Sequence, residues 1–469
     1  MNRRPSLPLR AAIFAGFAAL WWSLAAPLPL RAGPAAGGRR IYGLEDCLAL
    51  VPTQNPDVLA AGKQVDAAKA LVTQARAGIF PTLSAQGYYQ RRERSLASSG
   101  GLNQGLRTDD YTGDVRLTQN IFSSFAVRNR IAAAHLNERI AVLTYQATLN
   151  TALAGVREVF YSTLAAEASI AVRQGAIDLL AAQLKDQQDR LAAGTAGQVN
   201  VNRAQVALAN EQPPLLEARA NVRTAYASLA QLLGVAYAPG AVEAPFRVRG
   251  SLEVVPFALS REECIQQGFA NRPEIGARKL ALDVLARQLV VEKAGTRPQV
   301  NLFASYDVYS EPVVEATRDT FSGYTVGVAA SWTIFDGFAT LGRVRGVRAQ
   351  QGEAAAQLVG TRLQVETEVR NAFEQLRTAE ATLRPQSQNI ALAQETLNLT
   401  ARNFDAGLGT QLDVLQTRVD LTRAQSLELS GRLAYNLALT RLKRAMGTDV
   451  PSNALPARPG AVRVDPAAK

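Results

Sequence analysis

The sequence contains few of the residues on which catalysis and metal binding depend. Its 469 residues include one histidine, His135, and two cysteines, Cys47 and Cys264. They contain no HExxH segment, no Walker-type glycine-rich loop ending in Lys-Ser/Thr, no GxSxG segment and no cysteine pair at metal-site spacing. A solvated or packed role explains His135 better than metal ligation, and core packing explains the cysteines better than a disulfide. We therefore predict no enzyme, no cofactor and no metal site.

Aromatic residues and clustered charges are also scarce. Aromatic residues make up 6% of the chain, and Ala, Leu, Gln and Arg are abundant, which favours long helices over a thick globular core. The formal net charge is +11, but the basic residues are spread along the chain and form no run. Because binding to nucleic acid requires a clustered basic face, we predict that nucleic acid is not a partner.

The one long apolar run lies at the N-terminus. There, three arginines within the first ten residues precede an apolar stretch from Ala11 to Ala26, and small residues follow. This layout is typical of a cleaved secretory signal, so we assign residues 1–32 to a signal peptide and expect the mature chain to be exported. A retained anchor is the alternative, but the stretch is shorter than the ~20 apolar residues that span a bilayer.

The chain repeats itself once, in register, over nearly its whole length. Matched residues keep one constant spacing through the first part of each repeat and a slightly shorter one through the rest. The matched pairs include Cys47 and Cys264, Pro56 and Pro273, Phe122 and Phe335, Gly194 and Gly407, and Gly234 and Gly447. A unit of roughly 200 residues is too long for a solenoid repeat. We therefore predict repeats at 33–240 and 241–450, followed by a flexible tail at 451–469.

Each repeat is predicted to contain a helix, a β-hairpin and a helical hairpin, and the helix is interrupted at Pro56 or Pro273. The helical hairpins are expected at 121–234 and 336–447. The first helix of the earlier hairpin contains no proline, which predicts a helix roughly 100 Å long. Its counterpart contains Pro385, where a kink is expected. The apolar seam of the last helix is assigned to Leu412, Leu415, Val419, Leu429, Leu433, Leu437 and Leu442.

Two segments with alternating apolar and polar residues, 82–120 and 298–335, are predicted to be β-hairpins. The apolar positions of the last strand are Tyr324, Val326, Val328, Ala330, Trp332 and Ile334. In the strand before it, Phe303 and Tyr309 interrupt the alternation. Strands of about ten residues with one apolar face match the wall of a transmembrane β-barrel. A half-buried soluble sheet is the alternative, but the helices need their apolar stripes for one another.

Four such strands cannot close a barrel by themselves. A lipid-facing sheet cannot leave its edges open, because each unpaired N–H or C=O group in hydrocarbon costs several kcal/mol. Barrels begin at about eight strands. The pattern therefore predicts that two or more chains each contribute four strands.

Taken together, these features resemble the TolC-like outer-membrane efflux and secretion channels over essentially the whole mature chain. The segments that carry the resemblance are Asn55-Pro56-Asp57, Phe80-Pro81-Thr82-Leu83, Trp332-Thr333-Ile334-Phe335-Asp336-Gly337 and Gly409-Thr410-Gln411-Leu412-Asp413-Val414-Leu415. The resemblance implies a mixed, mainly α fold, in which a homotrimer forms a twelve-stranded β-barrel in outer-membrane lipid and an α-barrel tunnel across the periplasm. It also implies two further partners, a periplasmic adaptor protein and an inner-membrane transporter of the RND, ABC or MFS type.

The resemblance also suggests which residues surround the periplasmic entrance. Asp413 matches an acidic position that rings the closed entrance in the family, and Gln416 stands where related channels often carry a second acid. We assign Thr410, Asn200 and Arg203 to the same entrance. Carboxylates brought together by symmetry select ions through their local potential. However, Thr410-x-x-Asp413 also reads as a capping box for the helix that begins there.

The glycine turns of the helical hairpins resemble the tips that contact the adaptor. The residues assigned to these turns are Gly194, Thr195, Gly197, Gly407 and Gly409. A simple helix C-cap explains the glycines equally well. The residues that flank the turns and could link helices around a closed entrance are Gln187, Arg190, Arg402 and Asp405. Exposure to solvent is the alternative for these side chains.

The predicted function is conduction. We expect a passive outer-membrane channel-tunnel that carries export substrates from the periplasm or an inner-membrane pump to the outside and is opened by its partner pump. A trimeric structural or adhesive surface protein is the alternative, but it would not need two antiparallel helical hairpins of matched length in each chain. Drug, metal and protein exporters share such a conduit, so the resemblance selects no substrate.

Overall fold

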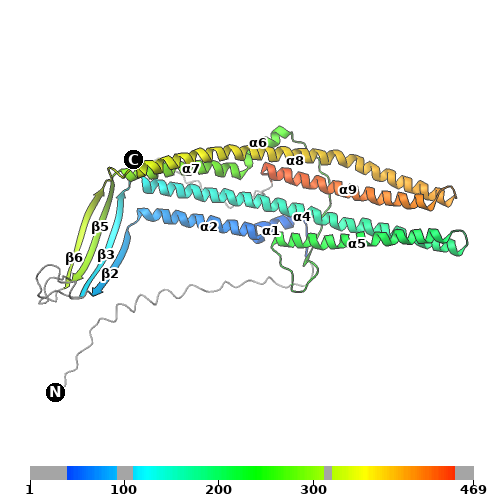
Figure 1. The fold of residues 1–469 in the computed structure, drawn as a ribbon, viewed down its shortest axis with the longest axis horizontal. Coiled ribbons are helices and arrows are strands. Elements are labelled where there is room, and N and C mark those ends of the chain that lie inside the picture. The colour runs from blue at the N-terminus through cyan, green and yellow to red at the C-terminus, as the bar shows by residue number, and fades with distance from the viewer. Residues whose placement is uncertain (1–39, 92–108, 311–319, 449–469) are drawn as a thin grey trace, which may run out of the picture. The chain divides into compact units, whose positions relative to one another are not determined.

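The elements of the fold follow one another twice in the same order, as the duplication predicts (Figure 1). The computed structural model describes residues 40–91, 109–310 and 320–448. The predicted signal peptide and C-terminal tail lie outside the described residues. Contacts separate Met1–Arg40 from Ile41–Lys469, and the elements below belong to the second of these units, apart from the first residue of β1.

Each repeat begins with two short helices that meet at a proline. In the first repeat these are α1 (Leu44–Gln54) and α2 (Pro56–Arg76), and in the second α6 (Arg261–Asn271) and α7 (Pro273–Lys293). A 3₁₀ turn follows each pair, η1 (Ala77–Ile79) and η2 (Ala294–Thr296). The predicted interruption is therefore confirmed. Proline suits the first helical position because that position needs no N–H donor.

The residues that directly precede these two prolines, Asn55 and Arg272, make different side-chain interactions. Asn55 caps α2, since its side-chain oxygen accepts hydrogen bonds from the backbone N–H of Asp57 at 3.0 Å and of Val58 at 3.1 Å. Its Nδ2 also donates to the carbonyl of Leu232 at 2.7 Å. Arg272, in the equivalent place, makes no cap. It is buried and forms ion pairs with glutamates instead.

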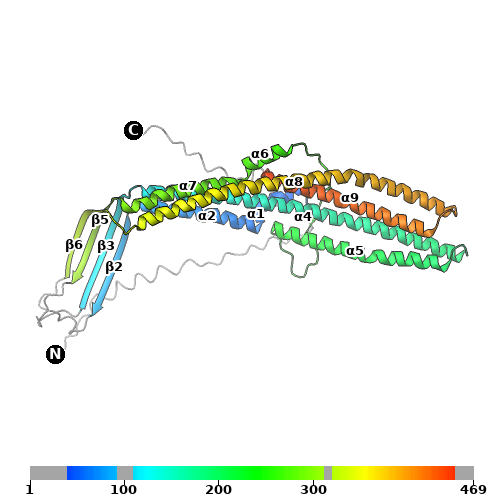
Figure 2. The same ribbon diagram turned by 45° about the horizontal axis from the view of Figure 1, so that its top comes forward.

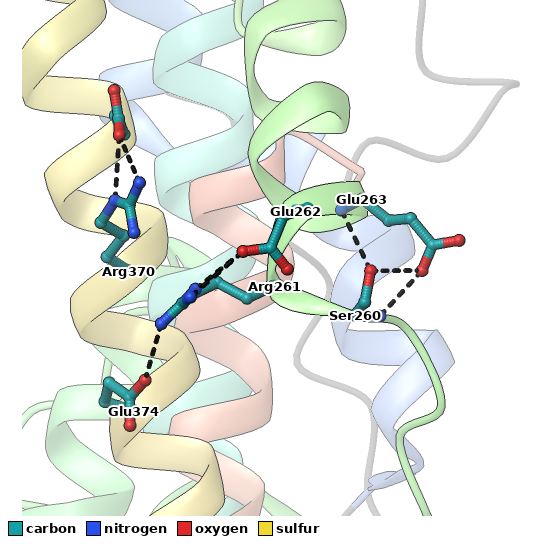
Figure 3. A network of polar contacts seen from close by, with 7 residues as sticks. Ser260, Arg261, Glu262, Glu263, Arg370 and Glu374 are labelled. Carbon is teal, nitrogen blue, oxygen red and sulfur yellow. Dashed lines mark hydrogen bonds and ion pairs between the residues drawn. The ribbon is translucent and has the colours of Figure 1, made fainter.

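The first residues of α6 are tied to the neighbouring long helix α8 (Ala339–Asp405) by polar contacts that Figure 3 shows. Ser260 and Glu263 form a capping box at the start of α6. Arg261 pairs with Glu262 at 3.1 Å and reaches Glu374 of α8 at 3.7 Å. These side chains are largely exposed, so each pair contributes little to stability.

Two helical hairpins make up most of the fold. The first joins α4 (Ala126–Ala192) to α5 (Gln198–Leu233), and the second joins α8 to α9 (Gln411–Met446). Both views show α5 running back along α4, and α9 running back along α8 (Figures 1 and 2). Both long helices contain 67 residues, which corresponds to roughly 100 Å. The α8 helix continues through Pro385, and the kink expected there stays a prediction.

Each hairpin has its own apolar core. One surrounds Cys47 with residues of α1, α4, α5 and the short strand β4 (Phe246–Val248), which pairs with β1 (Arg40–Tyr42). The other surrounds Cys264 with residues of α6, α8 and α9. Both cysteines are free and buried, which confirms that they pack in cores, and burial raises the pKa of the Cys47 thiol to about 12.

The last helix buries a wider stripe than the sequence suggested. Of the predicted seam, Leu415 and Leu442 are buried, but Leu412 and Val419 are 56% and 58% exposed, so their assignment was wrong for this chain. The residues that α9 buries include Val414, Leu421, Ala424, Tyr435, Ala438, Ala445 and Met446. The reason is that α9 packs against α4 as well as α8, so its buried face is not a single seam.

The four predicted strands form one antiparallel sheet in the order β2-β3-β5-β6. Their bounds are Thr82–Arg91 for β2, Asp109–Phe122 for β3, Gln299–Ser310 for β5 and Thr320–Ser331 for β6. The central pairing of β3 with β5 joins the two repeats. The sequence extended the last strand to Ile334, but the strand ends at Ser331, because β5 begins at Gln299 and offers no partner beyond it. The Nε1 of Trp332 donates to the carbonyl of Thr296 at 3.1 Å instead.

The register places the predicted apolar residues on one face. Ala85 lies opposite Val115, Val115 opposite Tyr306, and Tyr306 opposite Tyr324, so this row crosses all four strands. Most of the large residues of this face are exposed; Tyr324 is 82% and Val326 66% exposed. Among the described helices, none combines the length and hydropathy needed to cross a bilayer.

Candidate functional site

The turns at the ends of the two helical hairpins are built alike. Gly194 and Gly407 have φ values of +74° and +77°, a left-handed conformation that glycine adopts without steric cost. In each turn a backbone N–H reaches back five residues, from Thr195 to the carbonyl of Arg190 and from Leu408 to that of Asn403, both at 2.8 Å. This is the Schellman arrangement that ends many helices. It explains the glycines locally, and their role in adaptor binding stays a prediction.

The helix that leaves the second turn begins with the capping box that the sequence suggested. The Asp413 carboxylate accepts hydrogen bonds from the backbone N–H of Thr410 at 2.9 Å and from its hydroxyl at 2.7 Å, and the Thr410 Oγ1 accepts from the N–H of Asp413 at 3.3 Å. These bonds to the ionised form lower the pKa of Asp413. The carboxylate is exposed and charged, so capping and a role at an entrance are compatible.

Arg190 is the centre of a cluster that joins the two hairpins. Its guanidinium pairs with Asp186 on its own helix at 2.9 Å and with Asp405, the last residue of α8, also at 2.9 Å. It also lies 5.0 Å from the centre of the Phe404 ring. The bonds to Asp186 and Asp405 raise the pKa of Arg190. The C-terminal ends of α4 and α8 are thereby held together.

Gln187 and Arg402 do not take part in the link to Asp405. Gln187 is fully buried and donates to Asp186 at 3.0 Å, whereas the Arg402 side chain is exposed. Of the assigned entrance residues, Gln416 donates to Asp420 at 3.3 Å on the same helix, and the Arg203 side chain is exposed. Their roles at an entrance stay predictions.

Sequence reasoning missed further polar contacts between the hairpins. Gln411, the first residue of α9, is 3% exposed, and its Nε2 donates to the backbone carbonyl of Asn200 in α5 at 2.9 Å. Further along α9, Arg418 donates to the carbonyl of Leu179 in α4. A signal for the first contact was present, since Gln411 and Gln198 are equivalent residues that open the two returning helices.

The single histidine lies between two charged side chains. Nε2 of His135 lies 3.1 Å from Nη2 of Arg76, and its Nδ1 lies 3.3 Å from the Glu138 carboxylate. In the described residues, no three side chains of His, Cys, Asp or Glu are grouped so that they could hold a metal ion.

Comparison with known proteins identifies the architecture. The family profile described as outer membrane efflux protein matches residues 49–235 and 264–448, which is most of both repeats. The chain belongs to the outer membrane efflux protein family. Its function is that of an outer-membrane channel for export, with a tunnel that extends into the periplasm. The adhesive alternative receives no support. Family members are channels and not enzymes.

Individual relatives are distant but cover most of the chain. The cobalt-zinc-cadmium resistance protein CzcC of Cupriavidus metallidurans is 26% identical over 407 residues, which cover 86% of this chain and 90% of CzcC. Protein CyaE of Bordetella pertussis is 28% identical over 412 residues, covering 85% and 81% of the two chains.

Solved structures share the fold at low sequence identity. The CmeC outer membrane channel of Campylobacter jejuni aligns with a TM-score of 0.73 at 15% identity and covers 87% of this chain and 86% of its own. CusC aligns with a TM-score of 0.72 at 15% identity and covers 90% and 96%. These likenesses confirm a mainly helical, channel-type fold.

Proposed function

We propose that three copies of the chain assemble into one channel, with a twelve-stranded barrel made of four strands from each. The observation that carries this proposal is the open sheet. In the described residues, β2 and β6 each pair on one side only, and the apolar face between them is exposed. In hydrocarbon both edges need partners, because unpaired backbone groups there cost several kcal/mol each. Pairing the β2 edge of one chain with the β6 edge of the next satisfies every edge by symmetry.

The two faces of the sheet then acquire different surroundings. The row through Ala85, Val115, Tyr306 and Tyr324 faces lipid, where apolar and aromatic side chains are stable. The opposite row includes Asp114 and Asp307, which then line a water-filled lumen. A charged side chain is therefore tolerated on one face and costly on the other.

The hairpin turns form the periplasmic entrance in this proposal. Three Asp413 carboxylates, exposed at the first turn of α9, form an acidic ring that favours cations. Thr410, Gln416, Asn200 and Arg203 surround that ring, and Arg190 with Asp405 holds the two hairpins of each chain in the closed arrangement.

The glycine turns are the proposed contact for a periplasmic adaptor protein, which in turn connects the channel to an inner-membrane transporter of the RND, ABC or MFS type. Small residues at the turns allow helical hairpins to meet end to end. Names among the relatives refer to metal resistance for CzcC and to alkaline protease secretion for AprF of Pseudomonas aeruginosa. We infer that the transporter, and not this conduit, selects the substrate.

Insertion and conductance test the proposal with a matched pair of variants. Val326 and Thr325 are neighbours on β6 whose side chains point to opposite faces. Val326→Lys places a charge on the lipid face, where lysine costs about 2–4 kcal/mol near the bilayer midplane, and Thr325→Lys places it in the lumen. We expect Val326→Lys to reduce channel insertion into planar bilayers and Thr325→Lys to insert normally. Equal insertion of both would contradict the proposed orientation of the sheet.

A further inference from the structure

The polar face of the sheet contains an aromatic residue that the alternation pattern does not explain. Phe303 lies on this face of β5, and the guanidinium of Arg116 on β3 stacks over its ring, with its central carbon 5.8 Å from the ring centre. The residue opposite Phe303 on β6 is Gly327. A Cβ at Gly327 would lie 2.8 Å from Cζ of Phe303, so the ring occupies the space that a side chain there would fill.

Arg116 has carboxylates on its other side and does not pair with them. Asp114 precedes it by two residues on the same face, and Asp307 is the register partner of Asp114 on β5. Asp307 accepts a hydrogen bond from the Ser305 hydroxyl at 2.9 Å. No ion pair joins Arg116 to either carboxylate in the part of the sheet that the structure describes. The guanidinium is directed toward Phe303 instead.

This arrangement separates charges that would ordinarily neutralise one another. Like charges directly opposite each other destabilise an antiparallel pair, and Asp114 faces Asp307 in register. A two-residue step along a strand is roughly 6.6–6.8 Å, so Arg116 could reach the acids if it turned the other way. Covering Gly327 with an aromatic ring stabilises a sheet by itself, which explains Phe303 but not the direction of Arg116.

We propose that Asp114 and Asp307 form an acidic ring inside the barrel, that Arg116 forms a separate basic ring held apart by Phe303, and that these rings set the ion preference of the barrel. The inference rests on the proposed function, since it requires the polar face to line the lumen. Each chain contributes two carboxylates and one guanidinium to adjacent levels of this face. The barrel therefore prefers small cations to anions, independently of Asp413 at the other end of the tunnel.

Reversal potentials in a KCl gradient test the role of the charges. Recording at low salt limits screening. Arg116→Gln is expected to raise the potassium-to-chloride permeability ratio by about threefold, the effect of one unit charge roughly 5–6 Å from an ion in water. Asp114→Asn with Asp307→Asn removes two charges from each chain and is expected to lower the ratio by more, up to about tenfold. The matched control is Gln86→Ala, which changes the register partner of Asp114 without changing charge. The same series in an Asp413→Asn background removes the contribution of the entrance.

The positioning role of Phe303 has its own test. Phe303→Leu keeps every charge but removes the ring, so Arg116 is free to pair with the acids, and cation preference should fall. Phe303→Tyr keeps the ring and should restore the wild-type ratio. A merely structural role would change the yield of folded channels and leave the permeability ratio unchanged in both variants.

Failure of this inference is distinct from failure of the proposed function. If the wild-type protein forms no channels, the proposed function is wrong and this inference is wrong with it. If the wild type conducts but the Asp114 and Asp307 double variant has the wild-type reversal potential in both backgrounds, the proposed channel is retained. The proposal that these rings set the ion preference is then wrong.

Discussion

Arg190 and Asp405 form an ion pair of 2.9 Å between two helices that belong to different repeats. Its position at the ends of α4 and α8 means that the hairpins cannot separate there without breaking it. Because the pair is half-exposed, its coupling free energy is expected to be about 0.2–1 kcal/mol. A coupling of that size shifts a closed-to-open equilibrium by up to roughly fivefold.

We therefore predict that Arg190→Ala and Asp405→Asn each raise the resting single-channel conductance or the open fraction. The other partner of Arg190, Asp186, lies on the same helix, so removing Arg190 as well breaks no further ion pair between the hairpins. The double variant should therefore exceed Asp405→Asn alone by little. Glu395→Gln removes an exposed carboxylate of α8 as a control. Unchanged recordings for both single variants would show that the pair is only a surface contact.

Thr410 and Asp413 allow capping to be separated from ion selection. Thr410→Val removes the hydroxyl that accepts from the N–H of Asp413 but leaves the carboxylate charged. Asp413→Asn removes the charge. We predict that both variants loosen the first turn of α9, measured by hydrogen exchange, and that only Asp413→Asn reduces cation preference. If Asp413→Asn leaves selectivity and resting conductance at their wild-type values, Asp413 is only a cap.

The entrance should stay cation-selective in moderately acidic solution. Hydrogen bonds from Thr410 lower the pKa of Asp413, so its carboxylate is ionised below the usual aspartate range. A lowered folded-state pKa means that the cap stabilises α9 above the unfolded-state pKa and that this contribution is lost as the pH falls through the folded-state value. The hydrogen bonds from Thr410 should therefore let the acid-sensitive part of cation preference persist to lower pH than it would without them. Thr410→Val should move that transition to higher pH.

Substituting alanine for the glycines at two helix ends should destabilise the protein to different extents. Both Gly194 and Gly234 have positive φ, which costs alanine about 1–2 kcal/mol. A Cβ at Gly194 meets nothing within 4 Å, whereas one at Gly234 would lie 2.2 Å from the carbonyl oxygen of Gln54. We predict that Gly234→Ala lowers the thermal unfolding temperature in detergent clearly more than Gly194→Ala. If both variants lower the unfolding temperature equally, backbone strain and not the steric contact with Gln54 determines the cost of alanine.

Replacing Arg272 should lower the free energy of unfolding more than replacing an exposed arginine of α7. It is 8% exposed and pairs with Glu274 at 3.0 Å and with Glu368 of α8 at 2.9 Å. Arg272→Ala leaves two partly buried carboxylates without their cation, which is expected to cost about 1–3 kcal/mol. The control Arg278→Ala removes one exposed hydrogen bond to Gln357. A smaller effect for Arg272 than for Arg278 in thermal unfolding would contradict this assignment.

Features with a local cause could be predicted from the sequence. The prolines at 56 and 273 and the glycines at 194 and 407 mark helix ends because φ and N–H constraints act within a few residues. Strand alternation predicted the two faces, since side chains on a strand alternate whatever the partner strand is.

Features set by packing partners could not be predicted in the same way. The strand expected to reach Ile334 stops at Ser331, because its length depends on where β5 begins. Leu412 and Val419 looked like core residues, but the rotation of α9 is fixed by contacts with two long helices. Likewise, only the relative placement of α4 and α8 pairs Arg190 with Asp405 and leaves Arg402 exposed.

Native mass spectrometry of the protein released from detergent micelles tests the central claim, that the four-stranded sheet is one third of a closed barrel. The account predicts a complex of three chains that requires detergent for solubility and whose strand edges are protected from hydrogen exchange. A monomer that stays in solution without detergent, with exchanging edges at β2 and β6, would contradict it.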